Sequence, residues 1–128
     1  MAYYIARAVE GGFDAVVDKV TEALKGEGFG VLTTIDVAST LKQKIGVDFP
    51  RYKILGACNP GFAHQALIAE DKIGVLLPCN VIVKDAAGGG VEIAAIDPRN
   101  AMRQIGNPAL AEIADAVAEG LSRAINSV

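Results

Sequence analysis

The residues of this 128-residue chain that offer chemistry are its two cysteines, Cys58 and Cys79, and its single histidine, His64. All three fall within one stretch, ACNPGFAHQALIAEDKIGVLLPCN. A thiolate is a nucleophile and a ligand for soft metals, and an imidazole beside a thiol can act as its base. This stretch is therefore where the sequence predicts a reactive site, if the protein has one.

Cys58 is expected to end a strand immediately before a helix, because Asn59-Pro60 is a helix-start signal. Backbone N–H groups and the positive end of the helix dipole stabilise a thiolate in that position. The alternative is that Cys58 is a small apolar core residue, since free cysteine is among the most buried residue types. The sequence leaves both interpretations open.

Cys79 opens an apolar strand, where it is either a second site residue or an ordinary strand cysteine. If the strands that hold Cys58 and Cys79 are antiparallel neighbours, the end of one and the start of the other meet at one edge of the sheet. If the strands are parallel, the two thiols lie at opposite ends. Asn59 and Asn80 directly follow the cysteines and are candidate hydrogen-bond donors to such a site.

His64 is expected about one turn into the helix that follows Asn59-Pro60. A Cys58–His64 couple is possible across that helix start, although an isolated helical histidine is more often a surface residue. The cysteine spacing matches no zinc motif, because no C-x-x-C is present. We therefore predict no metal site within one chain, and the sequence leaves any cofactor unknown. A soft metal would need a further ligand from a dimer or from His64.

The bulk composition describes one compact domain over residues 1–128, with 52% hydrophobic residues and a formal net charge of −3. The twelve basic residues are scattered, so nucleic acid is not an expected partner. No segment approaches the roughly 20 apolar residues that span a bilayer. The N-terminus also lacks the pattern of a secretory signal. We expect a cytoplasmic protein with reduced thiols and no membrane partner.

Hydrophobic periodicity and turn residues predict the elements of the first half of the chain. They are a strand over 3–9, a helix over 13–24, a strand over 29–37, a short helix over 39–46, a strand over 52–58 and a helix over 62–70. Ser39 is the candidate N-cap of the short helix.

In the second half, the run IGVLLPCNVIVKD predicts two short strands with a kink at Pro78, because proline interrupts a strand. Residues 73–97 then form a hairpin around the glycine-rich turn 86–90, and residues 99–106 are expected to be irregular. Asn107-Pro108 starts a long C-terminal helix. The order is strand, helix, four antiparallel strands and helix, which predicts an α+β fold with helices packed on one face of a single sheet.

The phrases GFGVLTTIDV, ACNP and LLPCN, with the segments that join them, resemble the domain-of-unknown-function family 302 over roughly residues 13–98. The resemblance implies a small, mostly prokaryotic protein with a fold like that of the TATA-box-binding protein. It also implies a homodimer and an antiparallel arrangement that brings Cys58 and Cys79 to one edge. No activity is established for the family, and likeness to a DNA-binding fold transfers no function. Its signature residues are Cys58, Asn59, Pro60, Pro78, Cys79 and Asn80.

Three functions from different classes follow from these observations. The first is thiol-centred binding of a small molecule, a sulfur species or a soft metal at Cys58 and Cys79. The second is a non-catalytic module that binds an apolar ligand in a cleft lined by Ile54, Leu76 and Val81, with both cysteines in the core. The third is a dimerisation module. No motif in the sequence supports an enzyme, and none excludes one.

Overall fold

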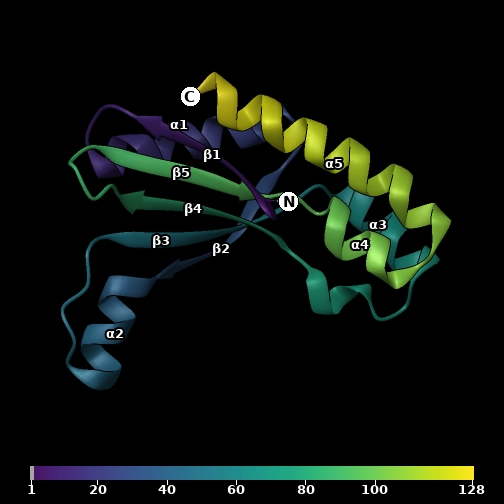
Figure 1. The fold of residues 1–128 in the computed structure, drawn as a ribbon, viewed down its shortest axis with the longest axis horizontal. Helices are drawn as coiled ribbons and strands as arrows, with labels where there is room; N and C mark the ends of the chain where they lie inside the picture. Colours follow the sequence, from purple (N-terminus) through teal and green to yellow (C-terminus); the bar gives the residue numbers. More distant parts are fainter. Residues whose placement is uncertain (1) are drawn as a thin grey trace.

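The computed structural model describes residues 2–128, in which one antiparallel five-stranded sheet is covered on one face by helices (Figure 1). The strand order across the sheet is β1-β5-β4-β3-β2. The strands are β1 (Tyr4–Val9), β2 (Gly30–Asp36), β3 (Tyr52–Cys58), β4 (Cys79–Asp85) and β5 (Val91–Ile96). The predicted α+β fold with a single antiparallel sheet is confirmed.

The helices are more numerous than the strand-and-helix order predicts. They are α1 (Phe13–Gly26), α2 (Val37–Ile45), α3 (Pro60–Ala69), the short 3-10 helix η1 (Ile73–Leu76), α4 (Arg99–Ile105) and α5 (Pro108–Ser127). Side-chain oxygens cap two of them as the Asn-Pro signals predict. Asn59 accepts a hydrogen bond from the N–H of Phe62 at the start of α3, and Asn107 accepts one from the N–H of Ala109 at the start of α5.

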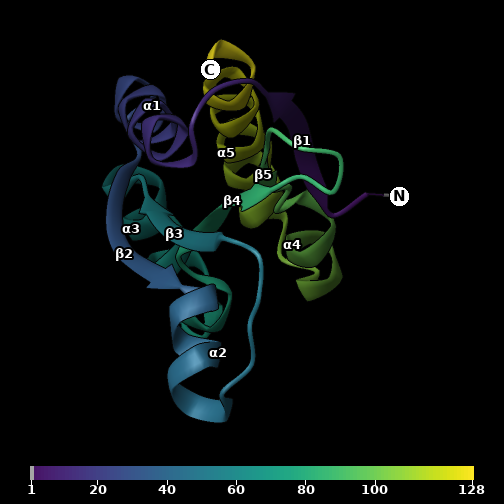
Figure 2. The ribbon, with the colours of Figure 1, turned by 90° about the vertical axis from the view of Figure 1, so that its left-hand side faces the viewer.

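Helices α1 and α5 cover the sheet together, as Figure 2 shows from the side. Alternate strand residues face them, because successive side chains in a strand point to opposite faces. The buried strand residues of this face include Leu55, Ala57, Val81, Val83, Ile93 and Ala95. Each large aliphatic side chain buried there stabilises the fold by about 1.5–3 kcal/mol relative to leaving it in water.

The first strand and the last helix are joined directly. The guanidinium of Arg7 in β1 donates hydrogen bonds to the carbonyl oxygens of Asn126 and Val128, at 2.7 and 2.6 Å. The last carbonyls of a helix have no partners within the helix and carry its negative dipole end, so a cation satisfies both needs.

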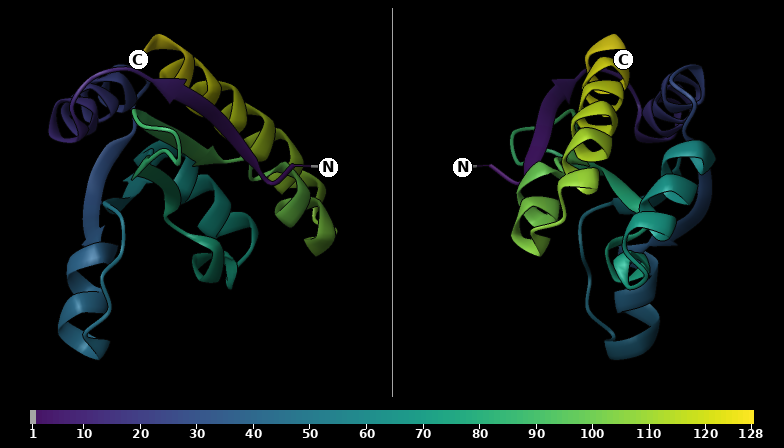
Figure 3. Two further views of the ribbon diagram at one scale, coloured as in Figure 1. Left: turned by 60° about the vertical axis from the view of Figure 1, so that its left-hand side comes forward. Right: turned by 90° about the vertical axis from the view of Figure 1, so that its right-hand side faces the viewer.

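Helix α2 and the loop that follows it, residues 37–51, project away from the rest of the molecule (Figure 3). We call this segment the arm. None of the nine residues of α2, all of which the structure describes, is buried. The predicted cap Ser39 is wrong. The helix begins two residues earlier, so Asp36 is the N-cap and accepts a hydrogen bond from the N–H of Ser39 at 2.9 Å.

Two further predictions are wrong. Residues 73–76 form η1 instead of a strand, with backbone hydrogen bonds such as Val75 N–H to the Lys72 oxygen at 3.1 Å, and β4 begins only after Pro78. Residues 99–106, predicted to be irregular, contain α4. Its single buried residue, Met102, creates no periodic signal, and Gly106 ends it in the left-handed conformation at φ 77°.

Candidate functional site

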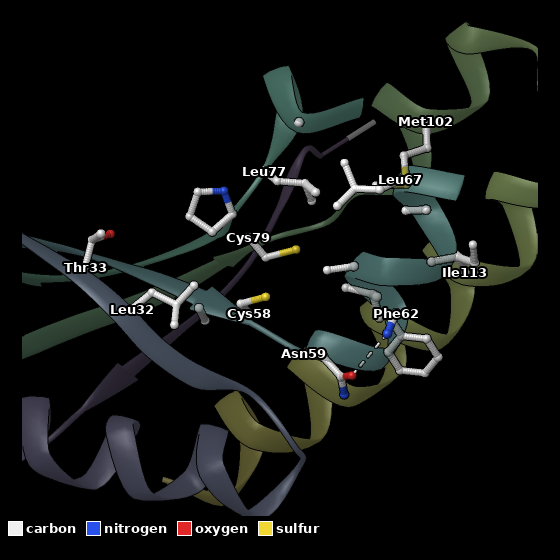
Figure 4. Close-up of a pocket in the computed structure, with 16 residues that line it drawn as sticks. Leu32, Thr33, Cys58, Asn59, Phe62, Leu67, Leu77, Cys79, Met102 and Ile113 are labelled. Atoms are coloured by element: carbon white, nitrogen blue, oxygen red, sulfur yellow. Dashed lines mark hydrogen bonds between the residues drawn. The ribbon is translucent and has the colours of Figure 1, made fainter. Parts of the chain in front are cut away.

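A cavity of about 390 Å³ lies at the α3 end of the covered sheet face (Figure 4). Its walls come from β2, β3, α3, η1, the start of β4, α4 and α5. Most of the lining side chains are apolar, among them Phe62, Leu67, Leu77, Met102 and Ile113. The volume lies in the range of small-molecule sites in proteins, which is roughly 300–1,000 Å³.

Two chain reversals at this end of the sheet create the cavity. Strand β3 ends at Cys58, and the Asn59 cap with Pro60 at the first helical position turns the chain into α3. Strand β4 starts at Cys79, directly after the cis peptide bond Leu77–Pro78. Because proline has no N–H to donate, the ladder between the two strands begins only after it.

The two cysteines lie together on the cavity wall. The antiparallel register of β3 and β4 pairs Ala57 with Cys79, so the end of one strand meets the start of the other. Both cysteines line the cavity, and their side chains point in the same direction from adjacent strands (Figure 4). The predicted meeting of Cys58 and Cys79 at one edge therefore agrees with the structure.

The environments of the two thiols differ. Both are free, Cys58 is partly exposed and Cys79 is buried. Burial and, to a smaller extent, the neighbouring Cys58 together raise the pKa of the Cys79 thiol from its ordinary value of 9.0 to about 11. Cys79 is thus a neutral thiol at pH 7, and Cys58 is the thiol that a reagent can reach.

The remaining predicted site residues do not gather around the thiols. His64 is exposed on α3 and is not among the residues that line the cavity. Asn59 does line it, although its side-chain oxygen is engaged in capping α3. Asn80 lies next to Cys79 in β4 and so faces the opposite side of the sheet. There it lines a second hollow, of about 430 Å³, with Tyr4 and Tyr52.

The predicted cleft residues are wrong as well. Ile54, Leu76 and Val81 do not line this cavity. Val81 is fully buried in the core, and Leu76 is exposed on η1. Two lining residues, Phe62 in the first turn of α3 and Met102 in α4, are not among the predicted site residues. One sequence signal could have indicated Phe62: it is an apolar residue three positions after the helix cap Asn59, and so lies in the first turn of the helix beside Cys58.

Gly56 allows the chain to close tightly beside the cavity. A Cβ atom at this position would collide with the Thr33 side chain of β2 and lie 2.9 Å from Cγ of Pro78. Thr33 and Pro78 both line the cavity. A residue without a side chain is therefore required for β2 and the segment before β4 to approach β3 this closely.

Within residues 2–128, no three His, Cys, Asp or Glu side chains are grouped as metal ligands would be. In the same residues, no helix is both long enough and apolar enough to cross a membrane.

The fold and the cavity define a class of protein: a small antiparallel α+β domain with one helix-covered sheet face and an apolar cavity that carries two thiols. The model of the family described as "Domain of unknown function DUF302" matches residues 5–128. The chain belongs to this family.

A solved structure supports the same assignment. The chain is similar to the structure titled "Crystal structure of uncharacterized conserved protein DUF302 from Bacillus stearothermophilus". The two share 31% sequence identity, the match covers 98% of each chain, and the TM-score is 0.91. No curated protein matches the chain.

Proposed function

We propose that the protein binds a small apolar molecule in the cavity beside Cys58 and Cys79. The observation that carries this proposal is the composition of the walls, which combine aliphatic and aromatic carbon with the sulfur atoms of Cys58, Cys79 and Met102. Each Å² of apolar surface that a ligand buries there contributes about 25 cal/mol. The few polar groups include Asn59, directly after the end of β3, and Thr33, in the middle of β2; they orient the ligand without dominating its binding.

The thiols fit this function as wall residues. Cys79 is buried and its raised pKa keeps it protonated at pH 7, so it presents a polarisable, uncharged sulfur to the cavity. A neutral, weakly polar ligand suits this surface. A charged ligand does not, because the walls offer no charge partner to offset its desolvation.

The test is a fluorescence titration with the neutral apolar probe N-phenyl-1-naphthylamine. Wild type is expected to bind the probe saturably. Ala63→Phe places a ring in the cavity and is expected to abolish binding. Ala111→Phe is the matched control, because Ala111 is exposed on α5 and does not line the cavity. Equal binding to wild type and to Ala63→Phe would show that the cavity is not the site.

A second candidate function is the binding of a soft metal ion or a sulfur species by the two thiols. The proximity of Cys58 and Cys79 on one wall favours it. Binding of Cu(I), for example, would form two Cu–S bonds and release both thiol protons, and thiolates are the preferred ligands of this ion. Native mass spectrometry after addition of Cu(I) under reducing conditions tests it. One ion per chain in wild type and none in Cys58→Ser is the supporting result.

A further inference from the structure

The arm, residues 37–51, exposes apolar side chains that its own chain leaves uncovered. Ile45 is 66% exposed, Val47 43% and Phe49 45%. The substantial contacts of α2 are with the neighbouring strands β2 and β3. A nine-residue helix is marginal in water unless an apolar face is packed against something. The arm therefore has the composition of a segment that packs against a partner.

A second exposed apolar patch lies on α3 and η1. It consists of Leu67, Ile68, Val75 and Leu76, and we call it the α3–η1 patch; Ile68 is 76% and Val75 84% exposed. The arm extends from the ends of β2 and β3, apart from α3 (Figures 1 and 3). Leu67 of the patch and Leu32, in the strand that leads into the arm, both line the cavity and both are exposed.

The charges of the two segments are complementary. The arm carries three basic residues and one acidic residue, a net charge of +2, while the remaining chain carries nine and fourteen, a net charge of −5. Residues 60–77 carry Glu70 and Asp71 against Lys72, a net charge of −1. Ion pairs within the chain engage Lys42 with Asp48, Lys72 with Asp71 and Arg51 with Asp14. Lys44 on the arm and Glu70 beside the patch carry opposite charges, and neither takes part in these ion pairs.

We propose that a second copy of this chain packs its arm against the α3–η1 patch, reciprocally about a two-fold axis. In such an interface the same two surfaces meet twice, so one chain must carry both complementary parts, as this chain does. The partner's arm then closes the mouth of the cavity and contributes apolar side chains to it. Closure of the cavity rests on the proposed function, whereas the association itself does not.

Sedimentation velocity and light scattering test the association. Wild type is expected at twice the chain mass of 13.3 kDa. The double variant Ile45→Asp with Phe49→Asp is expected at half the wild-type value, with an unchanged circular dichroism spectrum because both residues are exposed. Ile105→Asp is the matched control and stays dimeric, since Ile105 is 38% exposed and lies outside both segments. A monomeric wild type overturns the proposal, even if it binds another protein or a vesicle.

Cross-linking tests the pairing of the two surfaces. In a Cys58→Ser, Cys79→Ser background, Ile45→Cys and Val75→Cys together are expected to form a disulfide-linked dimer with glutathione disulfide as oxidant. Each single-cysteine variant is expected to stay unlinked. Linkage in Ile45→Cys alone would indicate arm-to-arm contact and overturn the reciprocal arrangement. An absence of linkage in all three variants would overturn it as well.

The two proposals fail separately. A dimer that does not bind N-phenyl-1-naphthylamine removes the proposed function and leaves the interface. A monomer that binds the probe overturns the interface and supports the proposed function. If both hold, the dissociation rate of the probe is expected to rise several-fold in the Ile45→Asp, Phe49→Asp variant, because the cavity mouth is then open. An unchanged rate would separate the interface from the cavity and overturn closure.

Discussion

The covered face of the sheet is packed to different densities at its two ends. Where α1 and α5 cross it, side chains fill the space completely: a Cβ atom at Gly120 of α5 would lie 2.9 Å from Cε2 of Phe29. At the other end, the same α5 and the shorter α3 leave a cavity of about 390 Å³. Both ends contain Leu, Ile, Val and Ala, so their aliphatic residues do not explain the difference in packing.

The difference lies in the helices and in how they are joined to the sheet. Helix α1 ends near β2 and lies along α5, so the two pack closely over the middle of the sheet. Helix α3 begins directly after the end of β3. After α3, the short helix η1 leads the chain back to the sheet at β4. A close-packed core loses stability when any atom is removed, whereas a cavity wall can lose or gain atoms with little effect. Three predictions test this contrast.

The largest effect is expected from truncation at the dense end. Leu121→Ala should lower the free energy of unfolding by about 3 kcal/mol, since Leu121 is fully buried and its removal leaves a new cavity. Leu77→Ala at the hollow end should cost about 1 kcal/mol, because Leu77 is only partly buried and already borders empty space. Urea denaturation measures both. Equal losses would contradict the contrast.

The next effect is a pH dependence located at the hollow end. The unfolded chain releases the Cys79 proton near pH 9 and the folded chain only near pH 11, so folding is favoured by the neutral thiol. The contribution is fully present below pH 9 and is lost as the pH rises to about 11, which amounts to about 2–3 kcal/mol.

The comparison that isolates this contribution is wild type against Cys79→Ala, which cannot titrate. The unfolding free energies of the two should converge as the pH rises from 8 to 11 by the amount given above, because lysines and tyrosines titrate equally in both. Parallel pH profiles would show that Cys79 is more exposed to solvent than its position in β4 indicates.

The smallest effect separates the two ends by added volume. Gly120→Ala forces the Phe29 ring to move and should cost about 1–2 kcal/mol. Ala63→Leu adds more atoms, but they extend into the cavity, so stability should stay within about 0.5 kcal/mol of wild type. Thermal unfolding of the pair is sufficient. A larger loss in Ala63→Leu would indicate that the cavity is already filled.

The sequence predicted those parts of the fold that have local signals. Asn-Pro pairs mark the starts of α3 and α5, and the apolar spacing of α1 is visible without a structure. Helices α4 and η1 were missed because neither buries more than one residue, so no period can form. The extent of α2 was misplaced by two residues, because both Asp36 and Ser39 are good caps.

The candidate site was predicted less completely than the fold. The antiparallel pairing of β3 and β4 could be expected, and the register places Ala57, the neighbour of Cys58, opposite Cys79. The prediction that Asn80 and Cys79 share one site was avoidable. Adjacent residues of a strand point to opposite faces of the sheet, and these two residues are adjacent in β4. The cavity lining depends on where four helices meet around the strand ends. No pattern along the chain records that arrangement.

The bond between Arg7 and the carbonyls of α5 has a consequence for the order in which the protein can be completed. Strand β1 is synthesised before the other elements of the domain, yet its partners are β5, through pairs such as Tyr4 with Ile96, and residues 126 and 128 at and after the end of α5. The pairing of β2, β3 and β4 needs none of the last helix. Strand β1 can therefore complete its contacts only after α5 has been synthesised, and until then the side of β5 that α5 covers stays exposed.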